Sequence, residues 1–399
     1  MKIVLFDVFI LLSVLSCIEC AKSYTIQPKK WDYRGHEIAF EVSHLVVDDD
    51  KDATAATISS DKSPILLLNG FGVGSFHQHR LIPELLLGKE ESSDDKKDNQ
   101  IVYCVDYLGQ GGSWPRDCND GLSDNEKDLA YSAETWIDQL CTFIEQVVLP
   151  QHPEQKVHVV GNSVGGHLAA HLAYQRPDLV ESICLLNPTP VWGLNLPGWS
   201  GHLPPTKVPR AIGRFLFDKI RDLTTIEKYL DAAYARKDAF DETLMNQIRG
   251  CTLGNGGHAA FASILWSPPL LVAGEKDFQK CLAGIDCDVL LMFGKDDPWC
   301  KPAFAKKMLQ ALSTRTNGKV QRYVEVENCG HCPNHEAPQA VGSVVNKWVN
   351  SKNRDVDNLS LVQSDKEVFD EAWGATPISE RQEEDIELSL LDLVAVTFV

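Results

Sequence analysis

The sequence predicts an α/β fold in which a mostly parallel sheet is flanked by helices and interrupted by an inserted helical cap. Six short runs are almost continuously apolar, as strands buried on both faces of a parallel sheet are, and they cover residues 65–68, 101–105, 157–160, 183–186, 289–293 and 323–326. Helix-like segments at 132–148 and 168–174 separate several of these runs and give a βαβ rhythm. Between residues 187 and 286 the rhythm stops, and a Pro- and Gly-rich segment leads into helix-like stretches that we interpret as the cap.

The N-terminal residues predict a targeting segment ahead of the fold. Residues 1–20 start with one Lys, continue as an apolar stretch to Leu15 and reach small residues near Ser16, which is the pattern of a secretory signal peptide. We therefore expect entry into the secretory route, and the stretch is too short for a convincing membrane span. The alternative is a buried or disordered N-terminus, because Asp7 interrupts the apolar run.

Four parts follow from these patterns. The targeting segment occupies 1–20, the α/β core 25–187 and 286–350, the helical cap 188–285, and a tail 351–399. Within the core, residues 31–47 alternate between apolar and polar, as an antiparallel strand pair does. The tail carries many Asp and Glu and few Lys or Arg, so we expect it to be mostly disordered.

Composition excludes some function classes. The net charge of -18 disfavours binding to nucleic acid or to an anionic membrane surface, whereas an uncharged apolar ligand remains compatible with it. Two of the 12 cysteines lie in the leader, and the other ten have no repeating spacing. We expect most of these to be buried thiols and not a disulfide framework.

The segment VHVVGNSVGGHLAA carries the strongest chemical signal. It places G-x-S-x-G, with Ser163 at its centre, between an apolar strand and a helix-forming stretch. This is the pattern of a nucleophile elbow, where a sharp turn requires small residues at Gly161 and Gly165. A serine hydroxyl is a poor nucleophile at neutral pH, so a base and an orienting acid are expected further along the chain.

The acid and the base are expected after the last two strands. FGKDDPW offers Asp296 and Asp297, and the strand register favours Asp297, although an error of one residue in the strand end would exchange them. The next strand runs into His331, so the residues follow the order Ser, Asp, His of the α/β-hydrolase fold. We expect His331 to bond Ser163 on one side and the acid on the other.

The oxyanion-binding groups are expected from backbone N–H groups. One belongs to Val164, directly after the nucleophile, and the other to Phe71 in the NGFGVG loop that follows the strand at 65–68.

CGHC, which surrounds His331, also permits a redox interpretation. Two thiols at this spacing, Cys329 and Cys332, resemble a reactive dithiol. We expect the helix that would lower a thiol pKa to be missing, because Pro333 and the residue after it interrupt the chain before Glu336 can start one. The two thiols and His335 imitate part of a zinc cluster without a fourth ligand, and we predict neither metal nor cofactor.

Taken together, these segments resemble the pheophytinase-like, chlorophyll-dephytylating branch of the α/β-hydrolase superfamily. The resemblance spans about residues 31–348 and rests on LLLNGFGVGSFHQHR, VDYLGQGGSWP, YSAETWIDQLCTFIEQVV, VVGNSVGGHLAAHLA, LLNPTPVWG, AAFASILWSPP, FGKDDPW and GHCPNHEAPQ. Cys332 belongs to the GHCP of this family, whereas Cys329 is an addition. Asn69 departs from the superfamily, which usually has His there.

The resemblance implies a serine esterase that releases phytol from pheophytin or chlorophyll, with a plastid location. The cap is then expected to supply an apolar pocket, lined by Trp192, Leu194, Trp199, Phe261 and Trp266. Two alternatives stay open: a carboxylesterase for another hydrophobic ester, which would be secreted or lie in an endomembrane lumen, and a non-catalytic ligand-binding protein on the same fold. The oligomeric state is not predicted.

Overall fold

The computed structural model describes residues 23–46, 62–88, 100–114, 131–193, 195, 215, 217–253, 257–351, 354 and 368–370. For residues 257–259, 261, 262, 302 and 368–370 the description is limited to the backbone. The predicted leader lies outside these ranges, as do most of the tail and part of the cap.

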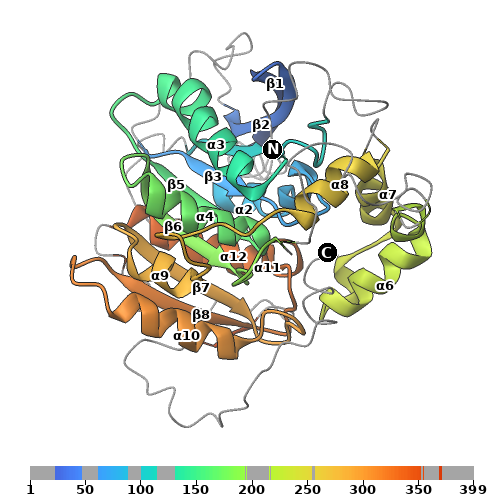
Figure 1. The fold of residues 1–399 in the computed structure, drawn as a ribbon. Helices are drawn as coiled ribbons and strands as arrows, with labels where there is room; N and C mark the ends of the chain where they lie inside the picture. Colours follow the sequence, from blue (N-terminus) through green and yellow to red (C-terminus); the bar gives the residue numbers. More distant parts are fainter. Residues whose placement is uncertain are drawn as a thin grey trace, which may run out of the picture.

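One mixed sheet forms the centre of the described residues (Figure 1). Its strand order is β1-β2-β4-β3-β5-β6-β7-β8-β9. The six strands from β4 to β8 in this order are parallel, whereas β1, β2 and β9 join antiparallel at the two edges. The strands are β1 Ser23–Tyr33, β2 His36–Val46, β3 Ile65–Leu68, β4 Val102–Val105, β5 Val157–Asn162, β6 Val180–Leu186, β7 Asp288–Gly294, β8 Gln321–Glu327 and β9 Val368–Asp370.

The predicted fold class is confirmed, and burial explains why the central strands are continuously apolar. All four residues of β3 are buried. Leu66 and Leu68 pack into the cluster on one face of the sheet, and Ile65 and Leu67 into the cluster on the other. Because successive side chains of a strand point to opposite faces, a strand covered on both sides has no polar position left.

Helices cover both faces of the sheet (Figure 1). The larger cluster includes side chains of α3, α4, α9 and α10, and the smaller one includes side chains of α2 and α12. The helices are α2 Ile82–Leu87, α3 Ala133–Phe143, α4 Val164–Gln175, α6 Leu223–Ala233, α7 Glu242–Gly250, α8 Gly257–Trp266, α9 Phe278–Ala283, α10 Pro302–Ser313, α11 Pro333–Glu336 and α12 Pro338–Asn350. Shorter turns are η2 Ser75–Gln78, η3 Ile144–Val148, η4 Leu149–Gln151 and η5 Lys237–Ala239.

The predicted N-terminal strand pair is present. β1 and β2 are joined at Arg34 and Gly35, which both have positive φ values, of 52° and 86°. Two successive residues with positive φ form the two-residue turn that matches the twist of a hairpin. The Asp32 carboxylate accepts a hydrogen bond from the Gly35 N–H at 3.0 Å and supports the turn.

The described cap helices, α6, α7 and α8, lie together at one end of the sheet in Figure 1. They fall between β6 and β7 in the chain, within the predicted insertion. Ile226, Leu230 and Leu244 from α6 and α7 form a third apolar cluster with Trp299 from the core. This cluster fixes the cap against the loop that follows β7.

One short part of the tail differs from the expected disorder. Val368–Asp370 pairs antiparallel with residues 325–327 of β8. The outer side of β8 presents a row of backbone donors and acceptors, so even a three-residue segment finds partners there. Among the described residues, no helix combines the length and the apolar character that a membrane crossing requires.

Candidate active site

The turn between β5 and α4 holds Ser163 in a conformation that few residues adopt. Its φ is 55° and its ψ is -118°. A Cβ atom at Gly161 would lie 2.3 Å from the Gly165 carbonyl oxygen, and one at Gly165 would lie 2.5 Å from the Leu68 carbonyl oxygen. Only glycine fits at either position, which is the physical reason for the G-x-S-x-G spacing.

Three side chains from separate strand ends form a hydrogen-bonded chain. His331 Nε2 lies 2.8 Å from Ser163 Oγ, and His331 Nδ1 lies 2.7 Å from Asp297 Oδ2. All three residues are buried. With the serine hydroxyl donating to Nε2, the other ring nitrogen carries the proton and donates to the carboxylate. The structure thus brings together the three residues expected as nucleophile, base and acid.

The carboxylate that reaches His331 is Asp297, and four donors hold it. Its Oδ1 accepts the backbone N–H of Trp299 at 2.8 Å and of Cys300 at 3.0 Å, and its Oδ2 also accepts the side-chain amide of Asn187. Asp296 is exposed. The ambiguity between the two adjacent carboxylates is therefore resolved geometrically in favour of Asp297.

Glu336 fixes the loop that carries His331. Its buried carboxylate accepts the backbone N–H groups of Gly330 at 3.0 Å and Cys332 at 3.1 Å, on either side of the histidine. The same carboxylate accepts the N–H groups of Ala235 at 2.9 Å and Arg236 at 3.2 Å, which follow α6 in the cap. One carboxylate therefore joins the cap to the histidine loop, a role that the sequence analysis missed.

The loop expected to bind an oxyanion lies beside Ser163. Gly70 and Phe71 line the same cavity as the serine, and Val164 is the first residue of α4. The loop is held by Asp106, whose Oδ1 accepts both the N–H and the hydroxyl of Ser75 at 2.7 Å. These contacts hold the loop close to Ser163.

Asn69, where the superfamily usually has His, is integrated into the same loop. Its side-chain oxygen accepts a hydrogen bond from Gln78 at 3.1 Å, and its carbonyl accepts one from Tyr107 at 3.0 Å. The amide therefore supports the loop through partners of its own.

A cavity of about 770 Å³, part of which is open to solvent, lies over Ser163 and His331. Its lining is predominantly apolar and comes from the oxyanion loop and the cap. The lining residues are Gly70, Phe71, Gly72, Val73, His77, Asn162, Ser163, Phe217, Ile220, Arg221, Ile226, Tyr229, Leu230, Tyr234, Ile248, Thr252, His331 and Cys332. No Asp or Glu is among them, so an apolar group fits this cavity better than a cation.

The expected pocket residues are placed differently. Trp192 is buried between Phe71 and Trp136, with ring centroids 4.8 and 6.3 Å away, and does not line the cavity. Trp266 is also absent from the lining. The described part of the cavity wall includes side chains of α6 and α7, such as Ile226, Tyr229 and Ile248, and a pocket role for the two tryptophans stays a prediction. Leu194, Trp199 and the Phe261 side chain lie outside the described residues.

A second set of histidines lies next to the site. His77 Nε2 is 2.8 Å from the Tyr234 hydroxyl, and the His77 ring stacks on His335 at 4.8 Å. Burial, with help from His331 and Arg80, lowers the pKa of His77 to about 3. His77 is therefore neutral at physiological pH and offers the cavity a polar group without charge.

The redox interpretation of CGHC loses support, although the prediction that no helix follows the two thiols is wrong. A short helix, α11, does begin at Pro333 and includes Glu336, because proline is well suited to the first position of a helix. Neither thiol, however, is part of a disulfide, and both are buried. Burial raises the pKa of Cys332 well above its usual range, which disfavours the thiolate that a redox site needs.

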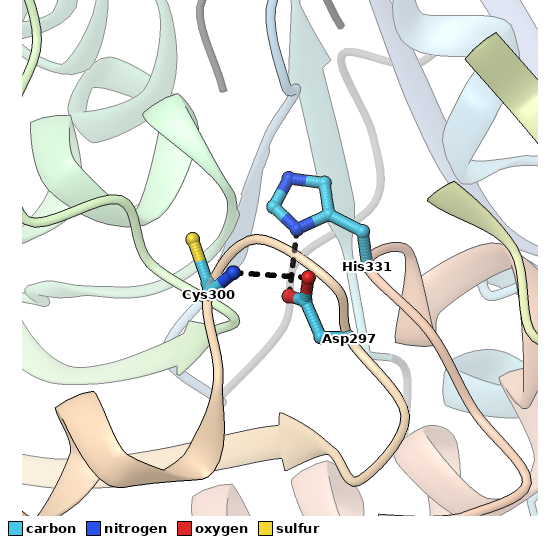
Figure 2. A group of neighbouring side chains, drawn as sticks. All are labelled: Asp297, Cys300 and His331. Carbon is cyan, nitrogen blue, oxygen red and sulfur yellow. Dashed lines mark hydrogen bonds and ion pairs between the residues drawn. The ribbon is translucent and has the colours of Figure 1, made fainter. Parts of the chain in front are cut away.

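Figure 2 shows a group of side chains with the donor set of a metal site. Asp297, Cys300 and His331 each offer one ligand atom, and these atoms lie within 4.8 Å of one another. His167 and His171 are four residues apart on α4, which is also the spacing of a zinc-binding pair, but their rings pack against each other and against Phe278 in the core.

Comparison with known proteins gives a family and several curated relatives, two of which are described here. The model of the family described as "Alpha/beta hydrolase family" matches residues 65–344. Pheophytinase, chloroplastic, from Arabidopsis thaliana is 27% identical over 78% of this chain, and the match spans 66% of that protein's own length. Proline iminopeptidase from Lactobacillus delbrueckii subsp. lactis is 26% identical over 74% of this chain and 92% of the relative.

Solved structures agree on the fold. A serine hydrolase involved in carbazole degradation superposes with a TM-score of 0.55 at 16% identity, covering 82% of this chain and 99% of the other. A haloalkane dehalogenase from Bradyrhizobium elkani superposes with a TM-score of 0.54 at 19% identity, covering 82% and 98%. At these identities the likeness concerns the arrangement of strands and helices alone.

Proposed function

The chain belongs to the alpha/beta hydrolase family, and from this premise we propose that it is a serine hydrolase that cleaves a carboxylic ester bond in a hydrophobic substrate. The observation that carries the proposal is the chain of hydrogen bonds from Ser163 through His331 to Asp297, at 2.8 and 2.7 Å, directly beneath an apolar cavity. This is the arrangement by which a neutral serine becomes a nucleophile.

The reaction follows from the positions of these groups. Ser163 Oγ attacks the ester carbonyl while His331 Nε2 accepts its proton, and Asp297 stabilises the imidazolium that forms. The backbone N–H groups of Phe71 and Val164 hold the developing oxyanion. His331 then protonates the leaving alcohol, and a water molecule activated by the same histidine releases the acyl group.

The finer proposal concerns the substrate, which we place among tetrapyrrole esters of a long-chain alcohol. Pheophytin is the first choice and chlorophyll the second, with pheophorbide or chlorophyllide and phytol as products. Support comes from the 27% identity to a pheophytinase and from an apolar lining suited to a ring system or a phytyl chain. The same relative carries a plastid designation, and this favours a plastid location here.

An aminopeptidase activity is less well supported. An enzyme that selects a free N-terminal amine needs a carboxylate or similar acceptor near the scissile bond. The described cavity lining contains no Asp or Glu and does contain Arg221. A general carboxylesterase for another hydrophobic ester remains the principal alternative, since the fold and the triad do not define a substrate.

A panel of substrates tests both levels of the proposal. The protein would be incubated with pheophytin, chlorophyll and a short-chain nitrophenyl ester, with Ser163→Ala as the matched control, and phytol would be separated chromatographically. Phytol release by wild type alone supports the pigment assignment. Rapid cleavage of the nitrophenyl ester without phytol release would leave a general carboxylesterase. Folded protein that a fluorophosphonate fails to label at Ser163 would favour a non-catalytic binder.

A further inference from the structure

The thiol of Cys300 has no part in the proposed reaction, yet it lies beside the pair of residues that activates the nucleophile. Cys300 is buried and free. Its sulfur is within 4.8 Å of the ligand atoms of both Asp297 and His331. Figure 2 shows the three side chains as one group, with Asp297 and Cys300 on the loop after β7 and His331 on the loop after β8.

These three groups match the preferences of a soft divalent cation. Thiolate, imidazole and carboxylate are all ligands of Zn²⁺, and three protein ligands leave a fourth tetrahedral position for water. Ligand atoms about 2.0–2.3 Å from a tetrahedral metal lie roughly 3.3–3.8 Å from one another, so shifts of about 1 Å suffice to close the site. Burial raises the pKa of the Cys300 thiol well above its usual range, so its proton is lost only when the cation binds. The two anionic ligands and the neutral imidazole then balance the charge of the cation, which matters in a buried position.

We propose that Asp297, Cys300 and His331 form an inhibitory binding site for a thiophilic divalent cation such as Zn²⁺. The cation binds His331 at Nδ1, the nitrogen that otherwise bonds Asp297. The Nδ1 proton moves to Nε2, and the thiol proton of Cys300 leaves to solvent, so one proton is released per ion bound. Of the three ligands only His331 lines the cavity, so the cation has to pass its ring to reach Asp297 and Cys300, which are buried behind it.

Inhibition follows from the change in tautomer. In the metal-free site Nε2 accepts the hydrogen bond of the Ser163 hydroxyl. Once Nδ1 is bound to metal, Nε2 carries a proton and cannot accept another from the serine. Asp297 is at the same time withdrawn from the imidazole. This consequence for turnover rests on the proposed function, whereas binding of the cation does not.

The test combines inhibition with a spectroscopic readout. ZnCl₂ would be titrated into full-length protein in metal-free buffer, and hydrolysis of a short-chain nitrophenyl ester would be followed relative to each variant's own metal-free rate. Cys300→Ala removes the sulfur, and Cys329→Ala is the matched control, since Cys329 is equally buried and near His331 but outside the ligand set. CoCl₂ would be titrated separately, because Co²⁺ bound to thiolate gives a charge-transfer band in the near ultraviolet.

We expect Zn²⁺ to inhibit wild type and Cys329→Ala equally. Cys300→Ala should raise the half-inhibitory concentration by at least about 100-fold, because loss of even an outer partner of a metal ligand typically costs 10–100-fold in affinity. The cobalt band should be present in wild type and absent in Cys300→Ala. If the alanine variant does not fold, Cys300→Ser preserves the volume and should also lose the band.

Equal zinc inhibition of wild type and Cys300→Ala, or a cobalt–thiolate band that persists without Cys300, overturns the proposal. The proposed function fails separately: a cobalt band that depends on Cys300 in a protein without esterase activity upholds the metal site and refutes the esterase. Esterase activity that zinc leaves unchanged refutes the inhibitory metal site and upholds the esterase.

Discussion

Replacing Glu336 by Gln removes one charge and converts one acceptor oxygen into an NH₂ donor at a point where four backbone N–H groups converge. Three of these donate to Oε2, at 2.9, 3.0 and 3.2 Å, and one to Oε1 at 3.1 Å. If the amide oxygen takes the Oε2 position, the NH₂ faces the N–H of Cys332. A buried donor left unsatisfied in this way costs about 1–3 kcal/mol.

The remaining three bonds weaken as well, because the acceptor is no longer charged. Hydrogen bonds to charged groups contribute about 1 kcal/mol more than neutral ones. Part of this loss is offset, because the buried carboxylate carries a desolvation cost that the neutral amide avoids. The same burial raises the pKa of Glu336. We expect a net decrease of about 3 kcal/mol in the free energy of unfolding.

Catalysis should suffer beyond this loss of stability, because the donors at Gly330 and Cys332 flank His331. A displacement of the base by about 1 Å costs roughly 100-fold in rate. One assay measures kcat and KM for a short-chain nitrophenyl ester without urea. A separate urea titration measures the unfolding midpoint. We expect kcat to fall by about 10–100-fold with KM little changed.

Glu325→Gln is the matched control. Glu325 is equally buried, but its carboxylate accepts the Tyr323 hydroxyl at 2.7 Å and lies within β8, away from the histidine loop. Its replacement should lower stability without a selective loss of kcat. Equal kcat losses in the two variants, or a Glu336→Gln variant with the wild-type kcat, would refute the positioning role.

Other substitutions test the remaining parts of the site. Ser163→Ala should reduce turnover by about a million-fold with an unchanged unfolding midpoint, since triad members act as a unit; a tenfold loss would contradict the nucleophile assignment. Asp297→Asn should lower kcat by about 10⁴-fold, because Asp297 holds the tautomer of the His331 base, whereas Asp296→Asn should lower it only slightly, because Asp296 is exposed. The reverse ranking in steady-state kinetics would reassign the acid. Burial and His77 lower the pKa of His335 to about 2, so its contribution to stability is complete above its usual pKa of about 6.5 and is lost as the pH falls below that value. His335→Asn should therefore reduce the acid dependence of the unfolding free energy between pH 6 and 4 by up to about 1.4 kcal/mol per pH unit, and urea titrations that show the wild-type slope would contradict this.

The arrangement of strands was largely predictable, because burial on both faces leaves a signal in the sequence. Each of the six apolar runs corresponds to one strand from β3 to β8, and the structure extends most of them by one to three residues. These extensions were not visible, because flanking residues such as Glu181 and Asp288 are polar even though they belong to β6 and β7.

Residues whose role depends on local backbone geometry were also predictable. The sharp turn at Ser163 requires glycines at fixed offsets, so the candidate nucleophile can be identified from one short segment of the sequence. Asp297 and His331 followed from their positions after consecutive strands. The strand register decided between two adjacent carboxylates, and the structure places Asp297 against the imidazole.

Features that depend on contacts between distant segments were not predictable. The cavity lining comes from side chains such as Phe217 and Ile248, whose spacing on amphipathic helices indicates burial without indicating what they face. Trp192 was expected at the pocket because of its family-like segment, whereas its ring stacks on that of Trp136. Glu336 gave no signal, since two of its four backbone partners, Ala235 and Arg236, lie about 100 residues away in the cap.

None of the nine described cysteines is part of a disulfide, so their thiols can report where the native protein opens. Seven of them are buried, in strands, helices and loops of both the core and the cap boundary. Burial raises the pKa of thiols such as Cys184 and Cys281, so alkylation has to wait until the surrounding structure opens. Pulses of an alkylating reagent, read by mass spectrometry, would therefore rank the segments of the native protein by how often each one unfolds, with no probe added to the sequence.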